Sequence, residues 1–206
     1  MVVAVAGYLL GSIPAGYLVA RAKGIDIRTV GSGNIGATNA FRVLGKAAGA
    51  GVLIFDALKG YAACTWVSVA LLRALKFPEA DFATPCVVAG IAAVLGHNYT
   101  CWLGFKGGKG IATSGGVYLA LAPLAVAIAL GAWLVLFAAT RFVSVGSIAA
   151  AIALPTAVWF TKDSVALGVA TTAVGLLAIF KHKANIQRLL AGTESRIGRK
   201  KPEGAR

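Results

Sequence analysis

The sequence has few acidic residues and few charged residues of any kind. Asp and Glu together number seven in 206 residues, and all charged residues make up 13%, about half the share found in soluble domains. A water-soluble domain is therefore a poor fit. The 58% share of hydrophobic residues instead indicates an integral membrane protein, and the length suits one compact helical bundle.

Cysteine is also scarce. The three cysteines, Cys64, Cys86 and Cys101, form no CxxC pair and lie in or beside apolar stretches, so neither a disulfide framework nor a cysteine metal site is expected. Lys and Arg are absent from the first ten residues, which argues against a cleavable signal peptide. The formal net charge of +13 does not require nucleic acid as a partner, because basic residues collect in the cytoplasmic loops of membrane proteins.

Apolar stretches and basic residues together decide how often the chain crosses the membrane. The stretches cover residues 2–20, 47–72, 83–100, 111–139, 143–161 and 164–180. Five basic residues follow the first stretch and eight follow the last, and the positive-inside rule places both groups in the cytoplasm. Six spans would put the two groups on opposite sides, so six spans conflict with the charges.

The fourth stretch resolves this conflict. As one helix its 29 residues would measure about 43 Å, against a bilayer core of about 30 Å, and Pro123 lies near its middle. We therefore expect two short segments, 108–121 and 123–139, with a turn at Ala122-Pro123. The predicted fold is an all-α integral membrane protein, a compact bundle of seven membrane segments with the N-terminus outside and the C-terminus cytoplasmic.

This topology makes the basic residues strongly asymmetric. All of them, Lys59 included, lie on the cytoplasmic side except Arg73, Lys76 and Lys162. Residues 1–194 are expected to form a single domain, and residues 195–206 a basic, disordered cytoplasmic tail. Every unusual polar motif then falls on the cytoplasmic face, and this convergence predicts a functional site there.

The first polar motif is GSGNIGATNAFR, residues 31–42. Its glycines permit a tight turn, and Ser32 and Asn34 can cap a following helix whose free N–H groups favour anions. Thr38 and Arg42 are four residues apart and share a helix face, where arginine can bind a phosphate through two contacts. A helix cap beside a topogenic arginine is the alternative interpretation.

The second motif is GFKGGKGIAT, residues 104–113, between two apolar stretches. The glycines around Lys109, together with Thr113 and Ser114, form the pattern of a backbone anion nest. The spacing is not that of a Walker A motif, which disfavours ATP hydrolysis. A flexible cytoplasmic turn with two topogenic lysines is the alternative.

The third and fourth motifs lie in the C-terminal half. RFVS, residues 141–144, adds Arg141 and Ser144, although a lone arginine between helices is often only a topology signal. KHKANIQRLLAGTE, residues 181–194, places His182 and Asn185 on one helix face. An amphipathic helix on the membrane surface is the alternative for this last motif.

Two further groups could serve either structure or chemistry. His97 stands at the end of the third span beside the glycine-lysine motif, where it could brace that loop or react. Asp56 and Lys59 are one helical turn apart, a spacing that favours a structural ion pair.

Three of these motifs, GSGNIGATNAFR, GFKGGKGIAT and KHKANIQRLLAGTE, together resemble the bacterial acyl-phosphate-dependent glycerol-3-phosphate acyltransferase family in order and spacing. Residues 11–14 (GSIP) and 96–99 (GHNY) also resemble it, although Thr100 stands where the family commonly has proline. The resemblance covers the chain to about Glu194. It implies a seven-segment enzyme that moves a fatty acyl group from acyl phosphate to the 1-hydroxyl of sn-glycerol 3-phosphate, giving lysophosphatidate and phosphate.

The resemblance also implies roles for particular residues. Lys109 and its glycines would form the glycerol-phosphate loop. Candidates for the catalytic site, around the acyl phosphate and the reacting hydroxyl, are Ser32, Arg42, Ser144, His182 and Asn185. The substrate-binding candidates are Gly31, Gly33, Asn34, Thr38, Asn39, Lys106, Gly107, Gly108, Lys109, Gly110, Thr113, Arg141 and Arg188. Whether His182 or a substrate phosphate takes the hydroxyl proton is left open.

The expected setting is the bacterial inner membrane, with the site on the cytoplasmic face and membrane lipid around it. No metal or cofactor is required by any motif. A transient contact with the enzyme that makes acyl phosphate is a further expectation. The rival function is transport of phosphate or a phosphate ester, which usually uses polar groups near the bilayer midplane and repeated halves, neither of which the sequence contains.

Overall fold

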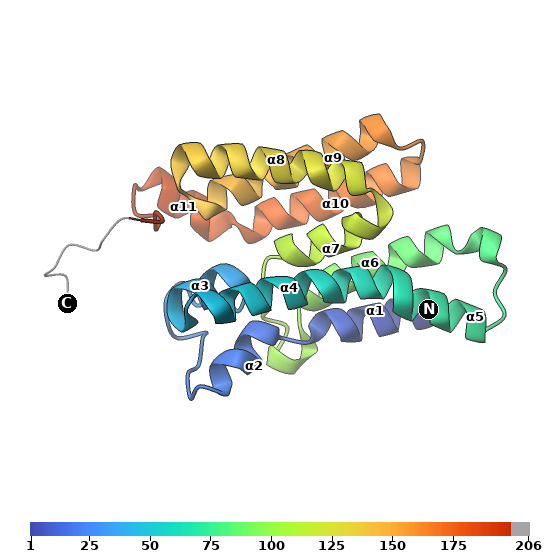
Figure 1. The fold of residues 1–206 in the computed structure, drawn as a ribbon, viewed down its shortest axis with the longest axis horizontal. Coiled ribbons are helices and arrows are strands. Elements are labelled where there is room, and N and C mark those ends of the chain that lie inside the picture. Colours follow the sequence, from blue (N-terminus) through green and yellow to red (C-terminus); the bar gives the residue numbers. More distant parts are fainter. Residues whose placement is uncertain (199–206) are drawn as a thin grey trace, which may run out of the picture.

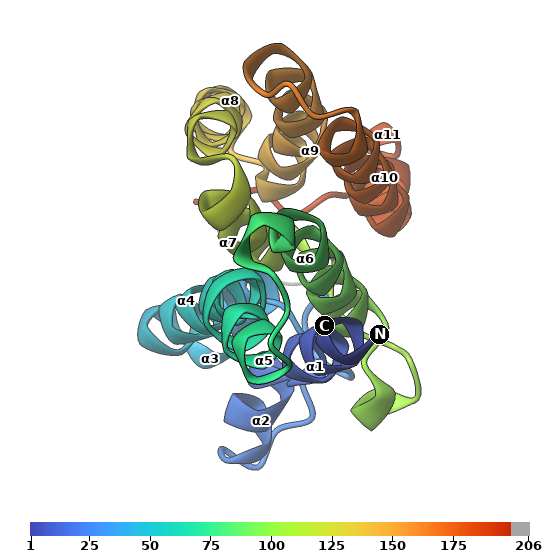
Figure 2. The same ribbon diagram turned by 90° about the vertical axis from the view of Figure 1, so that its right-hand side faces the viewer.

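The computed structural model describes residues 1–198, and this part of the chain is helical with no β-strand. The expected all-α class is therefore confirmed for these residues. The helices form two groups that lie side by side, as the end-on view in Figure 2 makes clear. The expected tail at 195–206 lies largely outside the described residues.

The first group is built by the N-terminal half of the chain (Figure 1). Its elements are α1 (Val2–Ser12), α2 (Ala15–Arg21), α3 (Ala37–Leu44), α4 (Lys46–Ala62), the π-helical turn η1 (Ala63–Val67), α5 (Ser68–Ala74), the 3-10 turns η2 (Glu79–Asp81) and η3 (Cys101–Leu103), α6 (Ala83–Asn98) and α7 (Ile111–Leu121). Helix α1 ends before Pro14, which lacks a backbone N–H and cannot continue it.

Small residues let the helices of this first group approach closely. Gly11 of α1 faces the Ala93 carbonyl of α6, and Gly60 of α4 faces the Thr113 carbonyl of α7; a Cβ atom at either glycine would overlap that carbonyl oxygen. Such contacts are typical of membrane helices, whose association depends on close packing because lipid provides no hydrophobic driving force. The first group is therefore a tightly fitted unit that carries the glycine-lysine loop.

The second group comprises α8 (Pro123–Thr140), α9 (Val143–Thr161) and α10 (Val165–Lys181), followed by the short α11 (Lys183–Leu190). Helix α7 joins the two groups, because its Val117 and Tyr118 are buried in one apolar cluster with Val94 of α6 and Val158 of α9. The chain turns between α7 and α8 at Ala122, directly before Pro123, as the sequence predicts.

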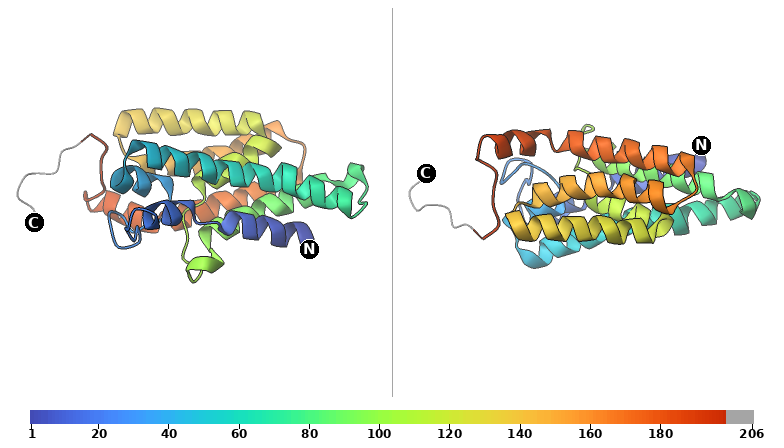
Figure 3. Two further views of the ribbon diagram at one scale, coloured as in Figure 1. Left: turned by 60° about the horizontal axis from the view of Figure 1, so that its bottom comes forward. Right: turned by 90° about the horizontal axis from the view of Figure 1, so that it is seen from above.

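Within residues 1–198, five helical stretches are long and apolar enough to cross a membrane, and α10 with α11, bent by 51°, makes up to six. Helix α7 is shorter, and it begins at Ile111 rather than at the expected residue 108, because residues 104–110 form the loop. Lys59 also departs from expectation, since it is buried in the middle of the α4–α5 span. Helices α3 and α11 lie at one end of the molecule and the N-terminus at the other (Figure 3).

Candidate active site

The glycine-lysine loop, residues 104–110, is held by backbone bonds to the end of α6. The N–H groups of Gly107 and Gly108 donate to the carbonyls of Asn98 (3.2 Å) and His97 (2.9 Å). These two glycines therefore attach the loop to the end of α6, and their N–H groups are not free for the expected anion nest. Gly110 has φ +81°, a conformation that favours glycine, and leads into the first turn of α7, whose free N–H groups favour an anion.

The loop before α3 is organised by Asn39. Its Oδ1 accepts from the Ser32 N–H (2.9 Å), and its Nδ2 donates to the carbonyls of Val30 (3.1 Å) and Ile27 (3.2 Å). The expected helix cap is wrong in detail, because Gly36 is the N-cap and Asn34 Oδ1 accepts from the Gly36 N–H instead. Asn39 thus fixes the loop that presents Ser32.

Helix α3 places Thr38 and Arg42 on the wall of the cavity that also receives Lys109. Arg42 is exposed and forms no ion pair with any described residue. An unpaired guanidinium at the wall of a cavity is available to an anionic ligand, which matches the role expected from the sequence.

His182 stands at the bend between α10 and α11. It is buried, and its Nδ1 lies 2.8 Å from the Ala178 carbonyl. Because a carbonyl only accepts, Nδ1 carries the proton in this bond, and Nε2 of the neutral ring is left as an acceptor. His182 also lines the cavity, so a residue at the site offers Nε2 as an acceptor.

Glu194 is the residue that sequence reasoning missed. Its carboxylate accepts from Ser144 Oγ (3.0 Å) and Asn185 Nδ2 (2.7 Å), and it forms an ion pair with Arg188 (Nε–Oε2, 2.7 Å). The Lys109 ammonium donates to Asn185 Oδ1, so the network reaches the glycine-lysine loop. Glu194 thereby joins α9, α11 and the α6–α7 loop at one point.

The chain reversal that delivers Glu194 follows α11. Gly192 has φ +68°, and the N–H groups of Thr193 and Glu194 donate back to the Arg188 carbonyl at 2.8 and 3.1 Å. A glycine after the last helical residue is a common sequence signal for the end of a helix, but it does not reveal that Glu194 then contacts Ser144 of α9.

Two pKa shifts follow from this arrangement. Burial lowers the pKa of Lys109 to about 8; Glu194 opposes this shift, and the positive charges of Arg188 and Arg42 add to it. Burial raises the pKa of Glu194, but the hydrogen bonds from Asn185, Arg188 and Ser144 outweigh it and leave that pKa below its usual value. Glu194 is therefore ionised at neutral pH, and Lys109 loses its charge only in mildly basic solution.

These residues surround a cavity of about 570 Å³ between the two helix groups. Its polar end contains all five candidates for the catalytic site, together with Gly31, Asn34, Thr38, Asn39, Lys109, Gly110 and Arg188. It continues between apolar side chains of α8, α9 and α10, among them Leu130, Leu154 and Val174. One cavity thus combines an anion-binding end with an apolar channel, and its volume suits a ligand of some size.

The other substrate-binding candidates do not line this cavity: Gly33, Lys106, Gly107, Gly108, Thr113 and Arg141. Lys106 is exposed, and Thr113 is fully buried against Gly60 of α4. Arg141 is exposed at the end of α8, where its carbonyl accepts from the Ile197 N–H (3.0 Å). Residue type and spacing in the sequence predicted a binding role for these residues, but the folded chain does not bring them to the cavity wall.

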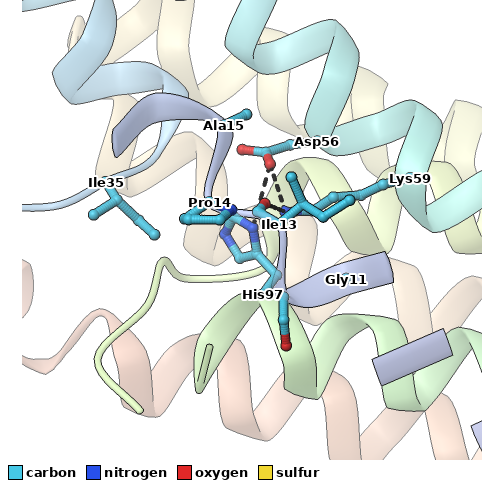
Figure 4. A pocket seen from close by; sticks show the side chains of 9 residues that line it. Gly11, Ile13, Pro14, Ala15, Ile35, Asp56, Lys59 and His97 are labelled. Carbon is cyan, nitrogen blue, oxygen red and sulfur yellow. Dashed lines mark hydrogen bonds and ion pairs between the residues drawn. The ribbon is translucent and has the colours of Figure 1, made fainter. Parts of the chain in front are cut away.

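Two residues on the cavity wall belong to a buried ion cluster (Figure 4). Asp56 of α4 pairs with Lys59 (Oδ1–Nζ, 2.8 Å), which confirms the ion pair expected from their spacing. Asp56 also contacts His97 of α6, and both Asp56 and His97 line the cavity. The third member, Lys59, does not line the cavity.

Known proteins resemble this chain along nearly its whole length. The family model described as "Glycerol-3-phosphate acyltransferase" matches residues 1–192. Relatives of that name from Geobacter metallireducens and Geobacter sulfurreducens are 51% and 47% identical, over 92% and 96% of this chain and 93% and 97% of their own.

Two crystal structures of PlsY, an integral membrane glycerol 3-phosphate acyltransferase, have a similar fold. The glycerol 3-phosphate form has a TM-score of 0.85 and 39% identity, and the lysophosphatidic acid form has a TM-score of 0.82 and 38% identity. Each comparison covers 95% of this chain and 94% of the other.

Proposed function

The chain belongs to the glycerol-3-phosphate acyltransferase family, and from that membership we propose that it moves a fatty acyl group from acyl phosphate to the 1-hydroxyl of sn-glycerol 3-phosphate. The products are 1-acyl-glycerol 3-phosphate and phosphate. This reaction opens phospholipid synthesis. The rival transport function is not favoured, because the relatives are named as acyltransferases.

The observation that carries the proposal is that one cavity combines a cationic end with an apolar continuation. Both substrates and both products contain phosphate, which needs N–H groups and cations, while the acyl chain needs an apolar channel. Lys109 and the first turn of α7 hold the phosphate of glycerol 3-phosphate. Arg42, Ser32 and Ser144 surround the phosphate of the donor.

The chemical step needs positioning and charge stabilisation. The 1-hydroxyl oxygen attacks the acyl carbonyl carbon, the bond from that carbon to the phosphate oxygen breaks, and phosphate leaves. Arg42 stabilises the negative charge that develops on the leaving group. Two groups can take the hydroxyl proton: Nε2 of His182, or an oxygen of a substrate phosphate. Glu194 keeps Asn185, Arg188 and Ser144 in place for this step.

We place the site on the cytoplasmic face of the bacterial inner membrane. The supporting observation is that α3, which lies within the basic first loop, and α11, which begins the basic tail, lie at the same end of the molecule (Figure 3). With α7 as a short seventh segment, the N-terminus is outside and the C-terminus inside. A transient contact with the enzyme that supplies acyl phosphate belongs to this proposal.

Acyl transfer by the purified protein in detergent or lipid tests the proposal. Glycerol 3-phosphate is supplied with acyl phosphate and, in parallel, with acyl-CoA, and lysophosphatidate and phosphate are measured. Product from acyl phosphate alone supports the proposed donor. Product from acyl-CoA alone would refute the donor and keep the enzyme class, and no product from either would contradict the function.

A further inference from the structure

Three ionisable side chains are buried together where α4 meets α6 and the break between α1 and α2 (Figure 4). Asp56 Oδ1 lies 2.8 Å from Lys59 Nζ and 3.4 Å from His97 Nδ1. Lys59 Nζ also donates to the Ile13 carbonyl at 2.8 Å. The exposed fractions of the three residues are 2%, 3% and 5%, so this cluster is almost completely buried.

Stability alone does not account for such a cluster. Burying charges carries a large desolvation cost, and apolar residues of similar volume in place of a buried ion pair are often neutral or stabilising. The place of the cluster points to another role. Two of its members, Asp56 and His97, reach the wall of the cavity, whereas Lys59 does not line it and is bonded to the Ile13 carbonyl.

His97 connects this cluster to the glycine-lysine loop. Its carbonyl accepts the Gly108 N–H at 2.9 Å. Its ring lies directly against Gly108, where an added Cβ would overlap Nε2 and lie 2.8 and 2.9 Å from Cε1 and Cδ2. The His97 ring thus packs directly against Gly108, the residue before Lys109. Because Nδ1 faces Asp56, the ring can rotate only by losing that contact.

We propose that Asp56 and Lys59 are positioning residues that fix the His97 ring, and that this ring sets the loop so that Lys109 meets the phosphate of glycerol 3-phosphate. The inference rests on the proposed function for the identity of that ligand. The three residues act through the loop rather than on the reacting atoms. The expected signature is therefore weaker binding of glycerol 3-phosphate, with the chemical step unchanged.

The double variant Asp56→Asn with Lys59→Met tests this proposal, because it removes both charges together and nearly conserves volume. We expect the KM for glycerol 3-phosphate to rise about tenfold, by analogy with the loss of a carboxylate that orients a metal-bound histidine. The KM for the acyl donor and kcat should stay unchanged. Unaltered KM values in the folded variant would overturn the proposal, and so would a lower kcat at unchanged KM.

His97→Asn provides a second variant, should the double variant fail to fold, and the same rise in KM is expected from it. Ser68→Ala is the matched control: Ser68 is fully buried in the same span, bonds to the Cys64 carbonyl at 2.7 Å, and does not line the cavity. It should leave KM unchanged. An equal rise in KM for Ser68→Ala would assign the effect to general packing and overturn the proposal.

Direct titration with glycerol 3-phosphate separates this inference from the proposed reaction. If the wild-type protein makes no lysophosphatidate, the proposed function fails. The positioning role is then tested by the thermal shift that glycerol 3-phosphate produces in the wild-type and double-variant proteins. A smaller shift in the double variant supports the role, and equal shifts refute it.

Discussion

Among the described residues, Asp56 and Glu194 each belong to a cluster of cationic and polar groups that contacts the glycine-lysine loop. Asp56 lies with Lys59 and His97 inside the first helix group, where the side chains of the ion pair are 2% and 3% exposed. Glu194 lies with Arg188, Ser144 and Asn185 at the cavity, where the Arg188 side chain is 38% exposed. Similar chemistry thus occurs once in a closed setting and once in an open one.

The difference lies in what each cluster leaves free. In the closed cluster every cation is committed to a carboxylate or a carbonyl, so it can only hold elements in place. In the open cluster Glu194 neutralises Arg188, while Arg42 and Lys109 remain as excess positive charge at the cavity. We therefore expect changes in the closed cluster to affect folding and loop position, and changes in the open cluster to affect turnover and binding.

The largest effect should come from breaking the closed pair on one side. Asp56→Ala leaves the Lys59 ammonium buried without its partner, and we expect the free energy of unfolding to fall by about 3–5 kcal/mol. Thermal unfolding of the purified variant in detergent measures this loss. A melting temperature equal to that of the wild-type protein would show that the cluster does not constrain the fold.

Arg42→Ala should have the next largest effect, on turnover rather than on folding. It removes a guanidinium that is exposed and unpaired among the described residues, so the fold should persist. We expect kcat to fall about 100- to 1,000-fold, as when an anion-stabilising donor is deleted. Near-normal turnover in a well-folded variant would remove Arg42 from the site.

Lys109→Ala should mainly weaken the binding of glycerol 3-phosphate. The loss of a charged hydrogen bond to phosphate is worth about 1.5–3 kcal/mol, which corresponds to a rise in KM of roughly 10- to 100-fold. Steady-state kinetics at saturating acyl donor measure this change. An unchanged KM for glycerol 3-phosphate would contradict the assignment of the loop.

A smaller effect should appear in the pH dependence. The pKa of Lys109 is lowered to about 8 by burial, so its ammonium is present below pH 8 and is lost as the pH rises through that value. The KM for glycerol 3-phosphate should therefore rise severalfold between pH 7 and pH 9. Lys109→Arg, whose charge persists across this range, should flatten the profile. A profile that is the same in both proteins would exclude Lys109 as its cause.

The smallest effect should come from an ion pair that neither cluster contains. Arg73 and Glu79 lie 3.0 Å apart at the far end of the molecule, with side chains 65% and 70% exposed. Exposed pairs contribute little, because water screens them. Arg73→Ala should leave both the melting temperature and the kinetic constants unchanged. A measurable loss of stability would contradict the view that only the buried ion pair contributes to stability.

The fold was largely predictable because apolar length and a proline mark helices directly. The run 111–139 is too long for one span, and the break before Pro123 is found where it was expected. The pairing of Asp56 with Lys59 also followed from local spacing. These features depend only on residues that are close together in the sequence, so they can be read from it directly.

The candidate site was predictable only in part, because several contacts join distant segments. Glu194 reaches Ser144 and Asn185 through the chain reversal at Gly192, and no local sequence pattern predicts these two contacts. Arg141 carried the right charge, but the αL conformation that ends α8 leaves it outside the cavity. Spacing identifies which residues share a helix face, whereas the packing of helices decides which face meets the substrate.

The shortness of α7 has a consequence for where the two substrates meet. Helix α7 has 11 residues and α8 has 18, so they measure about 16 Å and 27 Å from their common turn at Ala122. The loop that carries Lys109 therefore opens about 10 Å below the far end of α8, within the depth that apolar helices still enclose (Figure 1). We therefore expect glycerol 3-phosphate to enter the cavity from water, while the acyl chain of the donor stays between the apolar helices throughout the reaction.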